Sequence, residues 1–349
     1  MKRVFLLLTT AALLLSGCVG TQIQEPPPEE NDSLTLETLA VEIPRDGQDT
    51  DTLRQAAKTL PALLQQALAD QGVAVGEVRI TVGSSHAATA QALSQDSVDL
   101  AFLPAQDLAQ QAEEVPVILL SGPSFQDCGT ELENWNSGSG QAAAGHQGLI
   151  CTAPTEYGRN LARRAGDLTW EELTRARWGV LREDSLLCRQ AVDLWLADHY
   201  QGNTLSDLSE VTVFGDETAL LKAAAAGEID LFPMDASLRD RWTNLWTLSP
   251  DELDLWGDSG LGRTAPLWED VSVAGLTERF YDMAAAVRPD NGALADPRFA
   301  QALAAAIESL TVSAGEDTRQ LAQAVFGTSG YAAAPEGALN AARRLETLA

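Results

Sequence analysis

The sequence predicts an α/β protein with two lobes, and three observations carry this prediction. Short β-branched strands alternate with amphipathic helices, a pattern typical of parallel sheets covered by helices on both faces. The 349 residues, 45% of them hydrophobic, are enough for two domains with cores of ordinary size. A strand–turn–helix–strand unit occurs twice, ending once in Val98–Phe102 and again in Ile229–Phe232. Any α/β protein repeats such units, so this repeat supports a two-lobed fold only together with the other two observations.

The first 18 residues predict a lipoprotein signal peptide. Lys2 and Arg3 form a basic start, and residues 4–15 form an apolar run too short to span a bilayer comfortably. Leu15-Ser16-Gly17-Cys18 fits a lipobox, in which the Cys18 thiol takes the lipid. The alternative is an ordinary secretory signal with a chance cysteine. We expect the mature chain to be anchored at the outer face of the cytoplasmic membrane.

Residues 19–33 predict a disordered tether, because they include a proline run and almost nothing apolar. The net charge of −27 argues against nucleic acid as a partner and against direct adhesion to anionic lipid headgroups. Since no second long apolar stretch follows, contact with the membrane is expected through the lipid only.

Lobe 1 is expected to begin with residues 34–125. Leucines and alanines at helical spacing predict a long first helix that Gly72 ends and in which Pro61 would cause a kink or a restart. The polar turn Gly83–His86 separates an alternating strand from the next helix. The predicted elements are a strand over 34–41, a helix over 53–68, a strand over 78–82, a helix over 87–93, and buried strands over 98–103 and 115–120.

Lobe 2, with the crossover segments, is expected over residues 126–249. A glycine- and serine-rich stretch over 121–148 predicts loop and crossover, and Ser185 is a candidate cap for the helix that follows it. The predicted elements are strands over 149–153 and 178–181, a helix over 187–199, a strand over 211–214, a helix over 217–226 and a strand over 229–232.

The chain is then expected to return to lobe 1 over residues 250–349. A strand over 283–287 is followed by helices over 300–310, 318–326 and 338–348. A late strand followed by helices suits a chain that completes its first lobe.

Three cysteines, Cys128, Cys151 and Cys188, remain once Cys18 carries lipid, and any two of them could pair in an exported protein. Without a C-x-x-C spacing, neither a metal site nor a redox site is expected, and no cofactor is implied. No motif pairs a nucleophile with a base, so an exported enzyme is the weaker hypothesis. Cys188 beside His146 could be argued for it only from the register of the family resemblance given below.

Four collinear passages resemble the phosphate/phosphite/phosphonate-binding (PhnD-like) proteins of ABC importers. They are Val98-Asp99-Leu100-Ala101-Phe102, Leu168–Leu173 leading to Trp178-Gly179-Val180-Leu181, Phe214–Leu220 running to Gly227-Glu228-Ile229-Asp230, and Ala286-Val287-Arg288-Pro289. The resemblance implies a type II periplasmic-binding-protein-like fold with two crossover hinge strands and a ligand between the lobes. It also implies a monomer that works with an ABC permease and an ATPase.

The same resemblance implies ligand-binding positions at His86, His146, Ser185 and Asp216. Their flanking residues Ser84, Ser85, Glu217 and Thr218 complete the predicted set. Each has a simpler interpretation: the histidines could be turn residues, and Ser185 and Asp216 could be helix caps. Trp242, Trp246 and Trp256 could belong to the core or could wall the cleft.

The sequence departs from the family where an anion would bind. The family's hydroxyl-rich turn keeps only Ser185, followed by Leu186, Leu187 and Cys188, and Asp216 puts a carboxylate where a donor is expected. A phosphonate prefers several neutral or cationic donors, so a zwitterionic or neutral polar ligand is expected instead. A sensor or accessory lipoprotein of the same fold is the alternative to a transport role.

Overall fold

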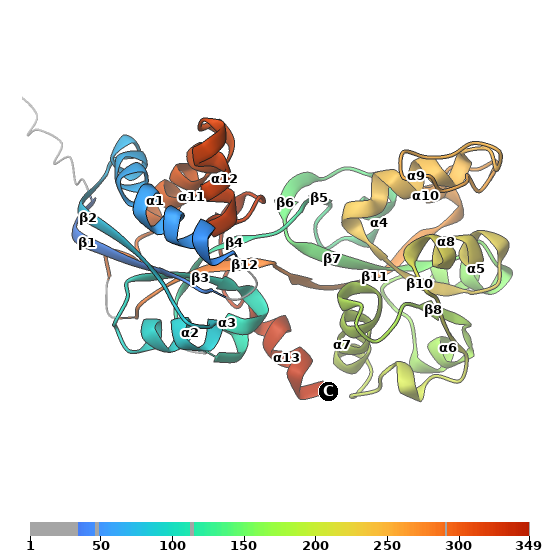
Figure 1. The fold of residues 1–349 in the computed structure, drawn as a ribbon. Helices are drawn as coiled ribbons and strands as arrows, with labels where there is room; N and C mark the ends of the chain where they lie inside the picture. Colours follow the sequence, from blue (N-terminus) through green and yellow to red (C-terminus); the bar gives the residue numbers. More distant parts are fainter. Residues whose placement is uncertain (1–33, 46–48, 112–114, 290–291, 349) are drawn as a thin grey trace, which may run out of the picture. The chain divides into compact units, whose positions relative to one another are not determined.

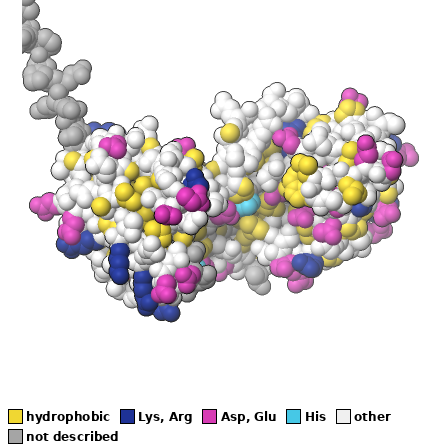
Figure 2. Space-filling view, turned by 45° about the horizontal axis from the view of Figure 1, so that its top comes forward, with side chains coloured by type: hydrophobic (Ala, Val, Ile, Leu, Met, Phe, Trp, Pro, Cys, Tyr) yellow, Lys and Arg dark blue, Asp and Glu magenta, His cyan; other side chains and the backbone are white. Residues whose placement is uncertain are grey.

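Two β-sheets, each with helices on both faces, organise the chain (Figure 1). The computed structural model describes residues 34–45, 49–111, 115–289 and 292–348. The predicted signal peptide with Cys18 and the predicted tether lie outside the described residues. On the face seen in Figure 2, acidic side chains are scattered over both halves and basic ones are fewer.

Lobe 1 is built on a six-stranded sheet with the order β13-β4-β12-β3-β1-β2. Its strands are β1 (Leu34–Ile43), β2 (Val73–Val82), β3 (Leu100–Pro104), β4 (Val117–Ser121), β12 (Met283–Val287) and β13 (Tyr331–Ala333). One face is covered by α1 (Thr50–Asp70), α11 (Pro297–Glu308), η4 (Ser309–Ser313) and α12 (Glu316–Phe326), and the other by α2 (His86–Ser94) and α3 (Ala105–Gln111).

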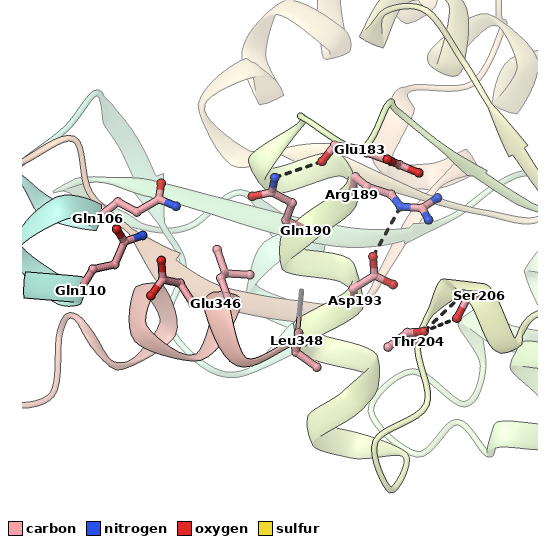
Figure 3. Close-up of a pocket in the computed structure, with 11 residues that line it drawn as sticks. Gln106, Gln110, Glu183, Arg189, Gln190, Asp193, Thr204, Ser206, Glu346 and Leu348 are labelled. Carbon is pink, nitrogen blue, oxygen red and sulfur yellow. Dashed lines mark hydrogen bonds and ion pairs between the residues drawn. The ribbon is translucent and has the colours of Figure 1, made fainter.

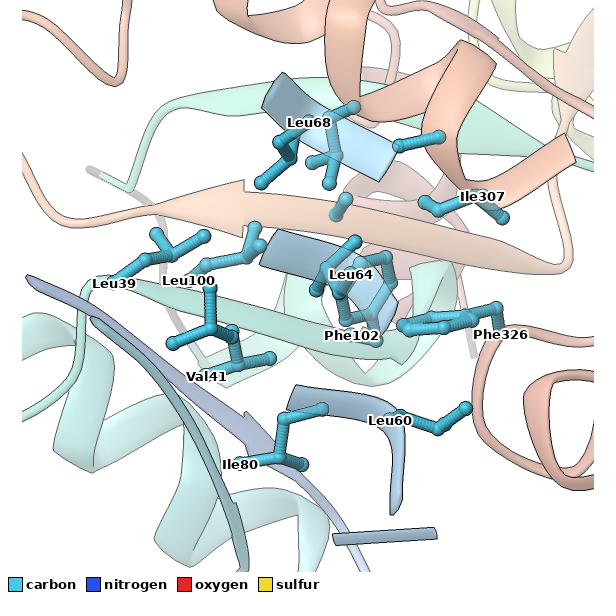
Figure 4. Packing of buried hydrophobic residues seen from close by; sticks show 14 of the residues in the cluster. Leu39, Val41, Leu60, Leu64, Leu68, Ile80, Leu100, Phe102, Ile307 and Phe326 are labelled. Atoms are coloured by element: carbon cyan, nitrogen blue, oxygen red, sulfur yellow. The ribbon is translucent and has the colours of Figure 1, made fainter. Parts of the chain in front are cut away.

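The core of lobe 1 follows from the spacing of leucines in α1. Leu60, Leu64 and Leu68 recur every fourth residue, so they share one face and are fully buried against the sheet (Figure 4). Phe102 of β3 meets Phe326 of α12 edge to face, with ring centroids 4.9 Å apart. This packing joins β3, an inner strand of the sheet, to α12.

Lobe 2 is built on a five-stranded sheet with the order β11-β7-β10-β8-β9. Its strands are β7 (His146–Thr152), β8 (Trp178–Val180), β9 (Val211–Val213), β10 (Leu231–Asp235) and β11 (Ser272–Phe280). The helices α4 (Leu132–Ser137), α8 (Glu217–Ala226), α9 (Arg239–Thr247) and α10 (Leu267–Asp270) contribute to the core on one face, and α5 (Glu156–Ala162), α6 (Trp170–Arg175) and α7 (Ala191–His199) to the core on the other.

The two sheets share one strand order. In each lobe, the three parallel strands lie in the order second, first, third along the chain, and a strand that comes from the other lobe lies beside the third. In lobe 1 this is β2-β1-β3-β12, and in lobe 2 it is β9-β8-β10-β7. The arriving strand is antiparallel to its neighbours in both sheets. The chain therefore has the α/β, two-lobed, type II periplasmic-binding-protein-like fold, and this prediction is confirmed.

The structure moves one predicted boundary. Because β11 pairs with β7 along its length, the residues up to Phe280 belong to lobe 2, and the chain returns to lobe 1 at Met283 rather than at residue 250. The first crossover also carries a hairpin where the sequence predicts a loop, formed by β5 (Ser124–Asp127) and β6 (Gln141–Ala144).

Two helices differ from expectation. α1 runs on through Pro61, which removes one backbone donor without ending the helix. The last helix, α13 (Asn340–Leu348), does not belong to lobe 1 alone. Ala342 joins the core beside α3, whereas Ala341 and Leu345 join the core of lobe 2. The Arg344 guanidinium also pairs with Asp198 and Glu278 of lobe 2.

Candidate ligand-binding site

The carboxyl ends of both sheets adjoin the crossovers. In lobe 1, β12 enters beside the end of β3, where Met283 pairs with Pro104. In lobe 2, β7 enters beside the end of β10, where Gly148 pairs with Asp235. Ligands of parallel sheets bind at this edge, near helix N-termini that offer free N–H groups. The loops that leave these strands therefore form the candidate site.

In lobe 1, the turn after β2 supplies three of the predicted residues. Ser84 is exposed, and Ser85 caps α2 by accepting a hydrogen bond of 3.2 Å from the Ala88 N–H. His86 opens the helix, and its Nδ1 lies 2.5 Å from the Asp107 carboxylate on α3. The structure thus joins His86 to an acidic partner that the sequence did not single out.

In lobe 2, the predicted polar residues serve as helix caps. Ser185 accepts from the Cys188 N–H at 3.4 Å and begins η1 (Leu186–Gln190), a turn of π-helix. Asp216 accepts from the Ala219 N–H at 2.8 Å and begins α8. Glu217 is exposed, and the Thr218 hydroxyl donates to Asp258 at 3.0 Å. Capping explains Ser185 and Asp216 fully in this structure, and a role toward a ligand remains a prediction.

His146 lies at the hinge, where β7 begins, and its Nε2 is 2.8 Å from the Asp282 carboxylate between β11 and β12. This pair connects the two crossover segments. The hydrogen bond with Asp282 raises the pKa of His146, and it outweighs the effect of burial. Because the pKa is raised, the charged pair is favoured below it and is lost as the pH rises through it. Asp235 adds a further negative potential at this histidine.

A pocket of about 460 Å³ opens between α3, α7 and α13 (Figure 3). Lobe 1 contributes the amides of Gln106 and Gln110 to its wall. The other lining residues are Glu183, Arg189, Gln190, Asp193, Thr204, Ser206, Leu345, Glu346 and Leu348. None of the eight predicted site residues lines this pocket, although Glu183 lies two residues from Ser185 and Gln106 precedes Asp107.

The pocket is polar and mainly acidic. Its three carboxylates belong to Glu183, Asp193 and Glu346, and its one cationic group, Arg189, already pairs with Asp193 at 3.4 Å. Burial raises the pKa of Asp193, against the hydrogen bond from the Leu205 N–H and the charge of Arg189. Such a lining suits neutral or positively charged groups better than anions.

The three cysteines among the described residues, Cys128, Cys151 and Cys188, are free and buried, so no disulfide joins them in this structure. Burial raises the pKa of Cys151 and of Cys188, which keeps both thiols protonated. A protonated, buried thiol is a poor nucleophile, and this weakens the argument for a catalytic Cys188.

Two features are absent from the described residues. Among them, no group of three or more His, Cys, Asp or Glu side chains is arranged to hold a metal ion. No helix in the same residues has both the length and the apolarity to cross a membrane.

Comparison with known proteins gives no match to a family model or to a curated protein. Solved structures do match. One is the binding protein component of an ABC phosphonate transporter from Pseudomonas aeruginosa, at 12% identity over 90% of this chain and 86% of that chain, with a TM-score of 0.33. PhnD1 from Prochlorococcus marinus in complex with methylphosphonate matches at 12% identity over 89% of this chain and 97% of that chain, with a TM-score of 0.34.

A third similar structure is Mh-p37 of Mycoplasma hyorhinis, described as a putative thiamine pyrophosphate transporter. Its identity is 9% over 86% of this chain and 95% of that chain, with a TM-score of 0.43. All three TM-scores are below 0.5, so the fold assignment rests on the strand order of this chain itself.

Proposed function

We propose that the protein is the extracytoplasmic solute-binding lipoprotein of an ABC importer, which holds a small polar solute between its lobes without transforming it. One observation carries the proposal: both sheets direct the carboxyl ends of their strands toward the two crossovers. The two crossovers provide a hinge about which the lobes can close on a ligand, and α13 contacts both lobes. A permease and an ATPase are the proposed partners of a monomer that needs no cofactor.

The ligand we propose is neutral or zwitterionic, with a cationic or amide group directed at carboxylates. Asp216 and Glu217 are exposed at the start of α8, and the lining of the pocket between α3, α7 and α13 includes Glu183, Asp193 and Glu346. A like-charge contact in a desolvated cleft costs several kcal/mol, so a dianion is disfavoured.

Calorimetry of the mature protein with inorganic phosphate and with methylphosphonate tests this ligand class. We expect both to bind weakly or not at all, and we expect Asp216→Asn to improve phosphate binding. Asparagine also caps helices, so the variant removes the charge and keeps the cap. Asp296→Asn, at the cap of α11 in lobe 1, is the matched control and should have no effect. Submicromolar binding of either anion to the unmodified protein would restore the phosphonate family's ligand.

The lipid anchor is tested separately with Cys18→Ala. The thiol is the only acceptor of lipid in the lipobox, so we expect the variant to be unprocessed or released rather than anchored. Fractionation of membranes from the host is the measurement. A variant that is processed and anchored like the wild type would leave Cys18 as a chance residue in an ordinary signal sequence.

A further inference from the structure

An exposed apolar tip stands on the loop that follows α9 in lobe 2. Leu253 is 64% exposed, Leu255 94% and Trp256 65%. Single exposed leucines are ordinary in soluble proteins, but three large apolar side chains within four residues form a patch. Such patches mark interaction sites when the segment that carries them is well ordered.

The loop is held in shape by hydrogen bonds. The Asp254 carboxylate accepts from the Trp256 and Asp258 N–H groups, both at 2.9 Å. The Asp254 N–H donates to the Asp258 carbonyl at 2.9 Å, and the Gly260 N–H donates to the Glu252 carbonyl at 3.1 Å. These bonds fix the turn, so little conformational entropy is left to lose when the tip binds.

One arginine anchors the loop to α9. Arg241 donates from Nε to Asp254 at 3.0 Å and from Nη2 to Asp258. Its guanidinium also contacts the faces of Trp242 and Trp256, 4.5 and 4.6 Å from the ring centroids. The cation is thereby engaged on the inner side of the loop and is no longer available to a partner.

The charge around the tip is negative. Asp251 and Glu252 are exposed beside it, and the bond from Thr218 to Asp258 brings the loop to the start of α8, where Asp216 and Glu217 are also exposed. An anionic membrane surface repels such a patch, and a second copy of the chain carries the same charge. A protein with an apolar pocket and a Lys/Arg rim is complementary in both respects.

We propose that Leu253, Leu255 and Trp256 form a docking surface for a protein that presents an apolar pocket rimmed by lysine and arginine. Identifying that protein with the importer's permease rests on the proposed function. The docking surface itself rests only on the exposure, the fixed shape and the charge of the loop.

The test places a photo-crosslinking phenylalanine derivative at position 255 of the full chain in its native membranes and identifies the cross-linked protein. The affinity of that protein, purified, is then measured for the wild type and for Leu255→Asp. Val312→Asp, at a 61% exposed position of lobe 1, is the control. We expect Leu255→Asp to lower the affinity about tenfold or more, as for a central interface anchor. The control should change it less than about twofold, as expected outside the contact.

Each outcome decides a separate point. Cross-linking to the permease together with the tenfold loss upholds both the docking surface and the transport role. Cross-linking to a different protein with the same loss upholds the docking surface and contradicts the permease assignment. Cross-links only to lipid or to a second copy, or equal affinities for Leu255→Asp and Val312→Asp, overturn the docking surface. Unchanged melting curves for both variants exclude a folding defect.

Discussion

Replacing Asp230 with alanine is expected to lower the free energy of unfolding by about 3 kcal/mol, the lower end of the range for breaking a buried ion pair. The Asp230 side chain is 4% exposed and accepts from Arg177 at Nη2 (2.8 Å), Nε (3.0 Å) and the backbone N–H (3.0 Å). The Thr155 hydroxyl donates a further bond of 2.6 Å. Because Arg177 is 41% exposed, water recovers part of its charge in the variant, and the loss stays at the lower end.

The control for this prediction is Glu228→Ala, which removes the same charge from an exposed position two residues away. Denaturant unfolding at pH 7 should separate the two variants clearly. Burial raises the pKa of Asp230, but the bonds from Arg177 and Thr155 outweigh it and leave the pKa below its ordinary value. The ionised Asp230 side chain therefore contributes to the free energy of unfolding above about pH 4, and this contribution is lost as the pH falls through the lowered pKa. An equal difference between wild type and Asp230→Ala at pH 7 and below pH 3 would contradict this account.

Replacing Gly145 with alanine is expected to destabilise the hinge. Gly145 has a φ of 116°, where a side chain costs about 1–3 kcal/mol of backbone strain. A Cβ at this position would also lie 2.7 Å from the Phe280 carbonyl oxygen, which belongs to the other crossover and cannot rotate away. We expect this overpacking to add about 1–3 kcal/mol.

Gly129→Ala is the control for the clash with the Phe280 carbonyl oxygen. Gly129 also has a positive φ, of 79°, but a Cβ there would meet nothing within 4 Å. Both variants place a side chain at a positive φ, and only Gly145→Ala adds the clash between the crossovers, so we expect Gly145→Ala to lose more stability. If urea unfolding gives both variants the same loss of stability, the close approach of the crossovers has no energetic importance.

The sequence predicted correctly the helices and strands that are marked by a regular spacing of apolar residues and by local capping residues. The helix over Glu217–Ala226 and the strand over Met283–Val287 have the predicted bounds, because the cap, the glycine and the apolar run are all local. β11 was missed because bulges between Val273 and Gly275 and between Leu276 and Arg279 interrupt the alternation that identifies a strand. β5 and β6 are short and partly polar, and they pair only with each other.

The site was less predictable than the fold. Capping residues such as Ser185 and Asp216 could be placed at helix starts from their residue types alone. The pocket joins Gln106, Asp193 and Glu346, which come from three helices far apart in the chain. No local period links such residues, so only the packing of α13 between α3 and α7 brings them together. Asp107, the partner of His86, and Asp282, the partner of His146, could not be predicted for the same reason.

The central claim is that the chain captures one small solute, and native mass spectrometry of the protein purified gently from its own host tests it most directly. The account predicts a single bound molecule per chain, of low mass, that is lost on denaturation. It also predicts that the bound molecule is neutral or zwitterionic. Only the bare mass of the chain, both as purified and after incubation with a small-molecule extract of the host's medium, would contradict the claim.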